Sequence, residues 1–216
     1  MKKETNAKKG IWKKILIIIL IILIVFFIWM LRNFIILNRI ESISKDKMEN
    51  SNFYAEIYTY NNGDFSIRKT FNKNDAYLTL LEFQIKNINE ERKILLYKNG
   101  NDNIGLIKSG DSKIAIENNE LVGGKCYVKN GIDGIEGLYK LIFAATSKIT
   151  SAQINSKDCY LISPCGTNWL MFIDKETGLL VREINGEYIT DYNYKFNVVT
   201  DEYIKRPDTT GYVIKD

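Results

Sequence analysis

The chain has 216 residues, with 30 Lys and Arg, 26 Asp and Glu and no His, which gives a formal net charge of +4 at pH 7. Without His the sequence excludes Ser-His-Asp and Cys-His catalysis, and it lacks the commonest metal ligand. Residues 1–40 hold eight of the basic residues and one of the acidic residues, so the remainder is weakly acidic and does not resemble a nucleic-acid-binding surface.

The first predicted element is a membrane-spanning helix at residues 15–37. Residues 15–31 contain no charge, no Pro and no Gly. As a helix these 17 residues are roughly 26 Å long, close to the ~30 Å hydrocarbon core of a bilayer. The helix continues to Leu37 if the Arg32 side chain reaches the headgroups. The lipid bilayer is therefore the first predicted partner, and a buried core helix is the alternative.

The charges around this helix predict its orientation. Six Lys residues precede the span, whereas only Arg32 and Arg39 follow it closely. By the positive-inside rule, residues 1–14 form a cytoplasmic tail and the domain after the span is extracytoplasmic. A cleaved signal peptide is the competing interpretation, but residues 30–33 offer no small-residue cleavage site. We therefore predict an uncleaved, single-pass signal anchor in a cell membrane, and the abundance of Lys, Ile and Asn suggests an AT-rich bacterial genome.

A second helical stretch follows the span, at residues 38–50. Ile36, Ile40 and Ile43 recur at helical spacing, with polar residues between them. We predict that this apolar stripe docks on the outer domain, residues 51–216. A solvated stalk is the alternative.

From Phe53 the hydrophobic period changes to two, which predicts β-strands. Short turns rich in Asn, Asp and Gly separate the first strands, and Asn61-Asn62-Gly63-Asp64 is a hairpin signal. We therefore expect a single curved antiparallel sheet of about nine to eleven strands and an α+β fold class. The predicted strands cover residues 53–60, 65–71, 76–85, 93–97, 104–108 and 113–117, and later 159–162, 169–173, 179–184 and 188–199.

One helix is predicted between the two groups of strands, at residues 133–147. Asp133 and Glu136 have the spacing of a capping box at its start. Apolar residues recur along it at i, i+3, i+4 and i+7, and we expect the face that they form to be buried against the concave side of the sheet. This face consists of Ile135, Leu138, Tyr139, Ile142 and Ala145.

The sequence offers little chemistry. Carboxylate pairs such as Glu90-Glu91 lie in predicted turns, where they are expected to be solvated surface. The three cysteines, Cys126, Cys159 and Cys165, leave two alternatives open: one disulfide with one thiol left over, or free thiols buried as small apolar groups. We predict a protein that is not an enzyme and that binds no metal and no cofactor.

The C-terminal quarter carries a family resemblance. Residues 169–178 read WLMFIDKETG, and residues 194–212 read YKFNVVTDEYIKRPDTTGY. An IDKETGL hairpin followed by a strand with FNVVTDE and then PDTTGY resembles bacterial extracytoplasmic proteins of the lipoprotein-carrier superfamily, which includes LolA, LolB and RseB. The resemblance implies an incomplete antiparallel β-barrel covered by helices, with an apolar cavity at its concave face. The better-known members are soluble or lipid-anchored, so a protein anchor departs from them.

Two classes of function follow. In the first, the outer domain binds a lipid, an acyl chain or a lipoprotein segment in its concave face. In the second, it is an envelope sensor or protein-interaction module with a filled core, no small ligand and an unidentified protein partner. No nucleic acid is expected as a partner, and the sequence leaves open which alternate set of side chains on each strand faces inward. The candidate lining residues are Tyr77, Leu81, Phe83, Leu138, Ile142, Tyr192, Tyr194 and Phe196.

Overall fold

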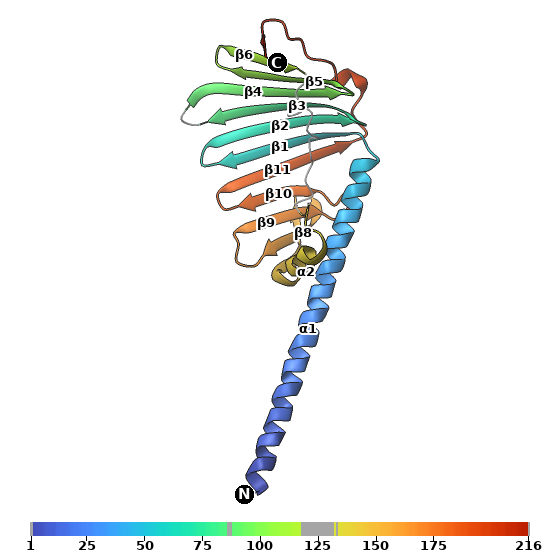
Figure 1. Cartoon of the computed structure of the whole chain (residues 1–216), viewed down its shortest axis with the longest axis vertical. Helices are drawn as coiled ribbons and strands as arrows, with labels where there is room; N and C mark the ends of the chain where they lie inside the picture. The colour runs from blue at the N-terminus through green and yellow to red at the C-terminus, as the bar shows by residue number, and fades with distance from the viewer. Residues whose placement is uncertain (1, 86–87, 118–131, 133, 216) are drawn as a thin grey trace.

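The computed structural model describes residues 2–85, 88–117, 132 and 134–215. Figure 1 shows a long N-terminal helix and a large sheet, part of which lies beside the upper end of that helix while the rest extends beyond it. Within the described residues the sheet has twelve strands, and its two edge strands, β12 and β7, do not pair with each other. The sheet is therefore open rather than a closed barrel, and the predicted α+β class is confirmed.

The elements follow the predicted order along the chain. The helices are α1 (Lys2–Glu49), α2 (Gly137–Thr146) and the single 3₁₀ turn η1 (Asp201–Tyr203). The strands are β1 (Phe53–Asn61), β2 (Asp64–Lys73), β3 (Ala76–Ile85), β4 (Ile88–Asn99), β5 (Asp102–Ser109), β6 (Ser112–Glu117), β7 (Ser147–Ile154), β8 (Lys157–Pro164), β9 (Trp169–Asp174), β10 (Leu180–Asn185), β11 (Tyr188–Phe196) and β12 (Val213–Lys215).

Within β1–β6 and within β7–β11, strands that follow each other in the chain pair as hairpins, and β1 with β11 joins these two groups. The strand order is β12-β6-β5-β4-β3-β2-β1-β11-β10-β9-β8-β7. Among the strand pairs that the described residues form, only β12 and β6 run parallel. In the β1–β2 turn, Asn62 and Gly63 have φ of 47° and 96°, as a two-residue hairpin of primed type requires. The hairpin predicted from this Asn-Gly pair is therefore confirmed.

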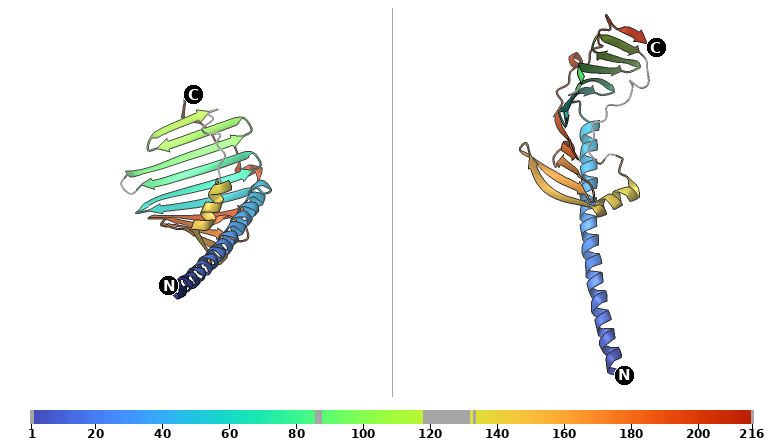
Figure 2. Two further views of the ribbon diagram at one scale, coloured as in Figure 1. Left: turned by 60° about the horizontal axis from the view of Figure 1, so that its bottom comes forward. Right: turned by 90° about the vertical axis from the view of Figure 1, so that its left-hand side faces the viewer.

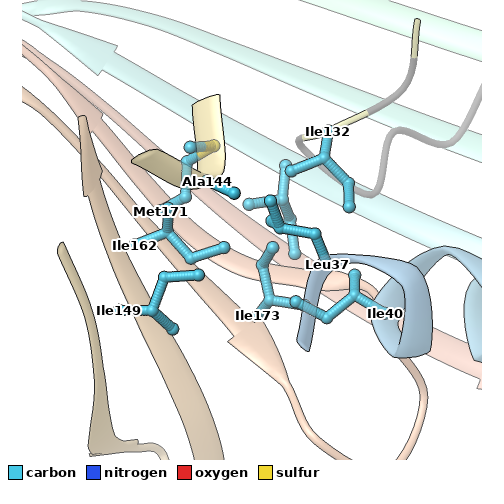
Figure 3. Packing of buried hydrophobic residues seen from close by; sticks show 9 residues of the cluster. Leu37, Ile40, Ile132, Ala144, Ile149, Ile162, Met171 and Ile173 are labelled. Atoms are coloured by element: carbon cyan, nitrogen blue, oxygen red, sulfur yellow. The ribbon is translucent and has the colours of Figure 1, made fainter. Parts of the chain in front are cut away.

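α1 runs without a break through both predicted helical segments, and its C-terminal part docks on the sheet. Leu37 and Ile40 are each 1% exposed and belong to the largest core cluster, beside Ile162 and Met171 (Figure 3). The predicted docking of the apolar stripe is confirmed, and the solvated stalk is excluded. Packing already begins at Met30, before the predicted stripe.

The sheet bends around the side on which α1 and α2 lie, so this side is its concave face (Figure 2). Strand register identifies the inward side chains. Ala55 lies opposite Tyr194 on one side and Thr70 on the other, and Thr70 lies opposite Thr79. Ala55 and Tyr194 pack with Met48 of α1 in one cluster. Odd-numbered residues of β1 and β3 and even-numbered residues of β2 and β11 therefore face the concave side.

The C-terminal segment covers the opposite, convex face in the other half of the sheet. Val199 and Ile204, on either side of η1, pack with Tyr97 of β4 and Ile104 of β5. The domain thus has two cores on opposite faces of one sheet, one under α1 and one under the C-terminal segment.

The prediction that Leu138, Tyr139 and Ile142 are buried against the sheet is wrong. They are 70%, 77% and 50% exposed, whereas Lys140 and Ala144 of the same helix are buried. The sequence of α2, GLYKLIFAAT, is apolar on nearly all sides, so its period does not identify the packed face. The packed face is set by α1, which receives the small Ala144 in the core and offers polar partners to Lys140.

α2 is also shorter than the predicted helix. It begins at Gly137, and Ser147 already belongs to β7. Glu136 is the N-cap residue and makes no capping hydrogen bond, while its expected partner Asp133, like Cys126, lies outside the described residues. All ten predicted strands are present, and β7 and β12 raise the number to twelve.

Candidate functional site

The concave face has two parts that differ in what covers it. Over β8 and β9, side chains of α1 and α2 fill it: Leu37 and Ala144 lie in one cluster with Ile162 and Met171, all nearly inaccessible to solvent. From β1 to β5, the inward apolar side chains Phe53, Ala55 and Tyr77 are buried, and the others that the structure describes are half-buried. This second part, called here the β1–β5 concave face, comprises Ile57, Leu81, Phe83, Ile94, Leu96 and Ile107.

Four of these side chains form one row across the sheet, with a cation among them. Each of the strands from β1 to β5 contributes one residue to this row, and each residue lies directly opposite the next: Ile57, Arg68, Leu81, Ile94 and Ile107. Directly opposed side chains on a sheet have Cβ atoms about 5 Å apart, so the row is a continuous strip that is apolar except at Arg68, which lies between Ile57 and Leu81.

Arg68 is the charged member of this strip. Its side chain is exposed and forms no ion pair with any residue that the structure describes. A guanidinium presents several N–H donors in a planar fork that matches a carboxylate or a phosphate. The strip therefore combines a surface suited to hydrocarbon with one group suited to an anion.

A hydrogen-bonded cluster borders the strip at β9, β10 and β11. The Glu183 carboxylate accepts hydrogen bonds from Trp169 Nε1 (2.7 Å) and from the Tyr192 hydroxyl (2.9 Å). Burial, and then the Glu183 charge, raise the pKa of Tyr192 well above its ordinary value, although the charge of Arg68 acts in the opposite direction. Tyr192 thus stays a hydrogen-bond donor at neutral pH. Because Trp169 and Tyr192 also pack on the core under α1, the cluster separates the strip from the filled part of the face.

Six of the eight predicted lining residues share the concave face, according to strand register. On β3, Tyr77 is buried, while Leu81 and Phe83 are half-buried. On β11, the three predicted aromatic side chains follow one another, with ring centroids 6.3 Å apart between Tyr192 and Tyr194 and 6.5 Å apart between Tyr194 and Phe196. Leu138 and Ile142 do not join them, because they are exposed on α2.

Sequence reasoning missed Arg68, Ile94 and Ile107. A usable signal was present in the β1–β2 turn. A two-residue turn at Asn62-Gly63 fixes the register of the hairpin, and that register places Arg68 opposite Ile57.

A separate, polar pocket of about 410 Å³ lies where the C-terminal segment meets the sheet. The ion pair between Lys73 Nζ and Asp201 Oδ1 (2.7 Å) forms part of its wall. Among the described residues no group of His, Cys, Asp and Glu is arranged to hold a metal ion, and Cys159 and Cys165 carry free thiols. The pocket is lined by Lys73, Asn74, Asp75, Ala76, Asn99, Gly100, Asp201 and Ile204.

Polar contacts attach α1 to the domain directly after its apolar run. The Asn33 side-chain amide donates to the carbonyl oxygens of Ala144 and Ser147, at 2.9 Å each. The Arg32 guanidinium donates to the Ile149 carbonyl at 3.3 Å. Because Asn33 is fully buried, this attachment is part of the core rather than a surface contact.

Before this attachment, α1 has the length and composition of a membrane span. The segment Trp12–Glu49 passes both criteria, and its most apolar window is not buried in the rest of the chain, which excludes the buried core helix. A signal sequence meets the same criteria. Trp12 and Trp29 lie near the two ends of the run, about 26 Å apart along the axis, and Trp is enriched at both interfaces of membranes.

Comparison with known proteins gives fold-level likenesses only. No family model matches the sequence, and no curated protein matches it. Among solved structures, a complex described as Pseudomonas aeruginosa MucA/MucB is 12% identical, with a TM-score of 0.37, over 80% of this chain and 60% of the other. MucB in complex with MucA(peri) is 10% identical, with a TM-score of 0.35, over 76% and 57%. MucB alone is 11% identical, with a TM-score of 0.39, over 80% and 62%. The chain spans about three fifths of the length of these solved chains.

Proposed function

We propose that this chain is a membrane-anchored, extracytoplasmic binding protein of the lipoprotein-carrier fold, and that its β1–β5 concave face holds an apolar chain from a lipid or a lipoprotein. The observation that carries the proposal is the strip of half-buried Ile and Leu side chains with the exposed Arg68 among them. The strip receives hydrocarbon, and the guanidinium receives a carboxylate or phosphate head. The proposal assigns no catalysis, metal or cofactor to the chain.

Burial of a hydrocarbon chain on an apolar strip can supply the free energy for such binding. Removing ~300 Å² of apolar ligand surface from water contributes about 7 kcal/mol before the costs of association. A charge-assisted hydrogen bond from Arg68 adds about 2 kcal/mol. An ionised fatty acid is therefore expected to bind more tightly than the alcohol of the same chain length.

This expectation is tested with full-length protein in nanodiscs, by displacement of a fluorescent fatty acid, with empty nanodiscs as the partition background. Arg68→Gln is expected to weaken binding of the acid about thirtyfold and to leave the alcohol unchanged, because a loss of about 2 kcal/mol corresponds to that factor when about 1.4 kcal/mol is a factor of ten. Leu81→Trp is expected to weaken both, since it fills the strip. Lys69→Gln and Leu80→Trp are the matched controls, because these neighbours point to the convex face. Equal losses of affinity in Arg68→Gln and Lys69→Gln, or in Leu81→Trp and Leu80→Trp, would count against the site.

A second candidate is a protein-interaction module with no small ligand. It is favoured by the way in which α1 fills the concave face over β8 and β9, with Leu37 and Ile40 buried as tightly as residues of the sheet itself. If no fatty acid of any chain length binds saturably in the displacement assay, the protein-interaction module is the function that remains.

The membrane anchor is tested separately. In intact cells or protoplasts, added protease is expected to digest a C-terminal tag and to spare an N-terminal tag, because the six Lys residues before the span keep the N-terminus in the cytoplasm. The purified protein is expected to retain its first residues. A mature N-terminus beyond Leu31 would show that the helix is a cleaved signal sequence.

A further inference from the structure

α2 carries an apolar surface that no described part of the chain covers. Leu138 and Tyr139 are more than two thirds exposed, and Leu141 and Ile142 are 38% and 50% exposed. The helix has one charged side chain, Lys140, and it points the other way, into the contact with α1. An exposed helix with an uncharged, mostly aliphatic outer face is the kind of surface that marks an interaction site. Leu138, Tyr139, Leu141 and Ile142 are called here the outer face of α2.

The contacts of α1 fix the position of this face relative to the apolar run. Asn33 binds the carbonyl oxygens of Ala144 and Ser147, at the C-terminal end of α2. Asn33 is two positions, or ~3 Å of helix, after Leu31, the last residue of the apolar run. Met30, inside that run, already packs against the core that contains Ala144. α2 is therefore at the same level along α1 as the end of the apolar run.

The orientation of α2 agrees with this position. Figures 1 and 2 show α2 at the end of the domain nearest the N-terminal half of α1, lying across α1 rather than along it. If α1 crosses a bilayer, α2 then lies in the plane of that bilayer. Two exposed basic side chains are at this level: Arg32 of α1 directly follows the apolar run, and Lys148 of β7 is two positions after the end of α2. Anionic headgroups would lie at these positions.

We infer that the outer face of α2 lies in the headgroup and upper acyl region of the bilayer that α1 crosses. The inference rests on the membrane anchoring proposed above. Tyr139 lies at the level of the headgroups, as aromatic residues at membrane interfaces do, and the aliphatic side chains reach the acyl boundary, as in helices that lie on a membrane surface. With α1 as one attachment and α2 as a second, the domain has a fixed rotation about the axis of α1, so the concave face opens in one direction along the membrane.

The test places a photoreactive residue on the outer face. Tyr139 is replaced by p-benzoylphenylalanine in the full-length protein, reconstituted in vesicles of phosphatidylethanolamine and phosphatidylglycerol and then irradiated. Tyr60, which is 45% exposed in the β1–β2 hairpin away from the N-terminal half of α1, receives the same residue as the matched control (Figure 1). Ile22, in the middle of the apolar run, reports on the anchoring itself. Lipid adducts are read by mass spectrometry.

The expected result is abundant lipid adducts at Tyr139 and Ile22 and several-fold fewer at Tyr60. The double change Leu138→Asp with Ile142→Asp is expected to reduce the adducts at Tyr139 several-fold without unfolding the domain, because both side chains are exposed. Adducts at Ile22 with none at Tyr139, or crosslinks from Tyr139 to protein, overturn the inference and leave the anchoring intact. Absence of adducts at Ile22 overturns the anchoring, and the inference with it.

Discussion

Replacing Gly178 with alanine is expected to lower the free energy of unfolding by about 3 kcal/mol or more. Gly178 has φ of +68°, a left-handed conformation that costs other L-residues roughly 1–2 kcal/mol. A Cβ atom on its backbone would lie 2.6 Å from the Ile40 carbonyl oxygen and 2.8 Å from the Ser44 amide nitrogen of α1. Because both are helix backbone atoms, the overlap is relieved only if α1 moves off the β9–β10 turn, which adds an overpacking cost of about 1–3 kcal/mol. Denaturant unfolding of the full-length protein in micelles measures the loss.

Gly186→Ala is the matched control for this prediction. Gly186 also has a left-handed φ, of +60°, but nothing lies within 4 Å of the position that a Cβ would occupy. Its replacement is expected to cost only the backbone component, roughly 1–2 kcal/mol. Equal losses in the two variants would contradict the close approach of α1 to the β9–β10 turn.

Replacing Glu41 with alanine is expected to destabilise the protein by about 2 kcal/mol. The Lys140 ammonium is nearly buried between α2 and α1, where it pairs with the Glu41 carboxylate and donates to Asn38 Oδ1 at 3.2 Å. Removing one partner of a buried pair costs about 3–5 kcal/mol because the other charge stays buried and unpaired. The Glu41 side chain is 46% exposed, so solvent reduces that cost here.

A double-mutant cycle separates this pair from simple loss of packing. Lys140→Met keeps the aliphatic stem and removes the buried charge, so it is expected to change stability by less than about 1 kcal/mol. In the Lys140→Met background, Glu41→Ala is expected to cost almost nothing. If Glu41→Ala costs as much in that background as in the unmodified protein, the ion pair is not the reason for the loss.

The elements of the sheet follow from local sequence, whereas their partners do not. The period of two and the Asn-Gly turn identify strands such as β1 and β2, because both signals come from neighbouring residues. β7 was missed because SKITSAQI is largely polar, and one of its two buried residues, Ser147 and Ile149, is itself polar. The buried face of α2 depends on α1, about a hundred residues earlier in the chain, and its own composition is nearly uniform around the helix.

The sequence alone does not identify the inward side of the strands, for a physical reason. Both faces of the sheet are covered in part, the concave face by α1 and the convex face by the C-terminal segment, so apolar residues occur on both. On β3, Leu80 and Leu81 are both half-buried although they point to opposite faces. The predicted aromatic residues of β11 proved to share one face with Leu81, but the position of Arg68 emerged only from the register of β1, β2 and β3.

Mapping a photoreactive fatty acid on the full-length protein tests the proposed binding function most directly. A chain with a terminal diazirine, crosslinked in nanodiscs and located by peptide mass spectrometry, should label Leu81, Ile94 and Ile107 on the β1–β5 concave face. Their neighbours Leu80, Leu95 and Leu106, which face the convex side, should remain unlabelled, and an excess of unlabelled fatty acid should abolish the adducts. Adducts confined to the apolar run of α1, or spread equally over the two sets of neighbours, would contradict binding at the concave face.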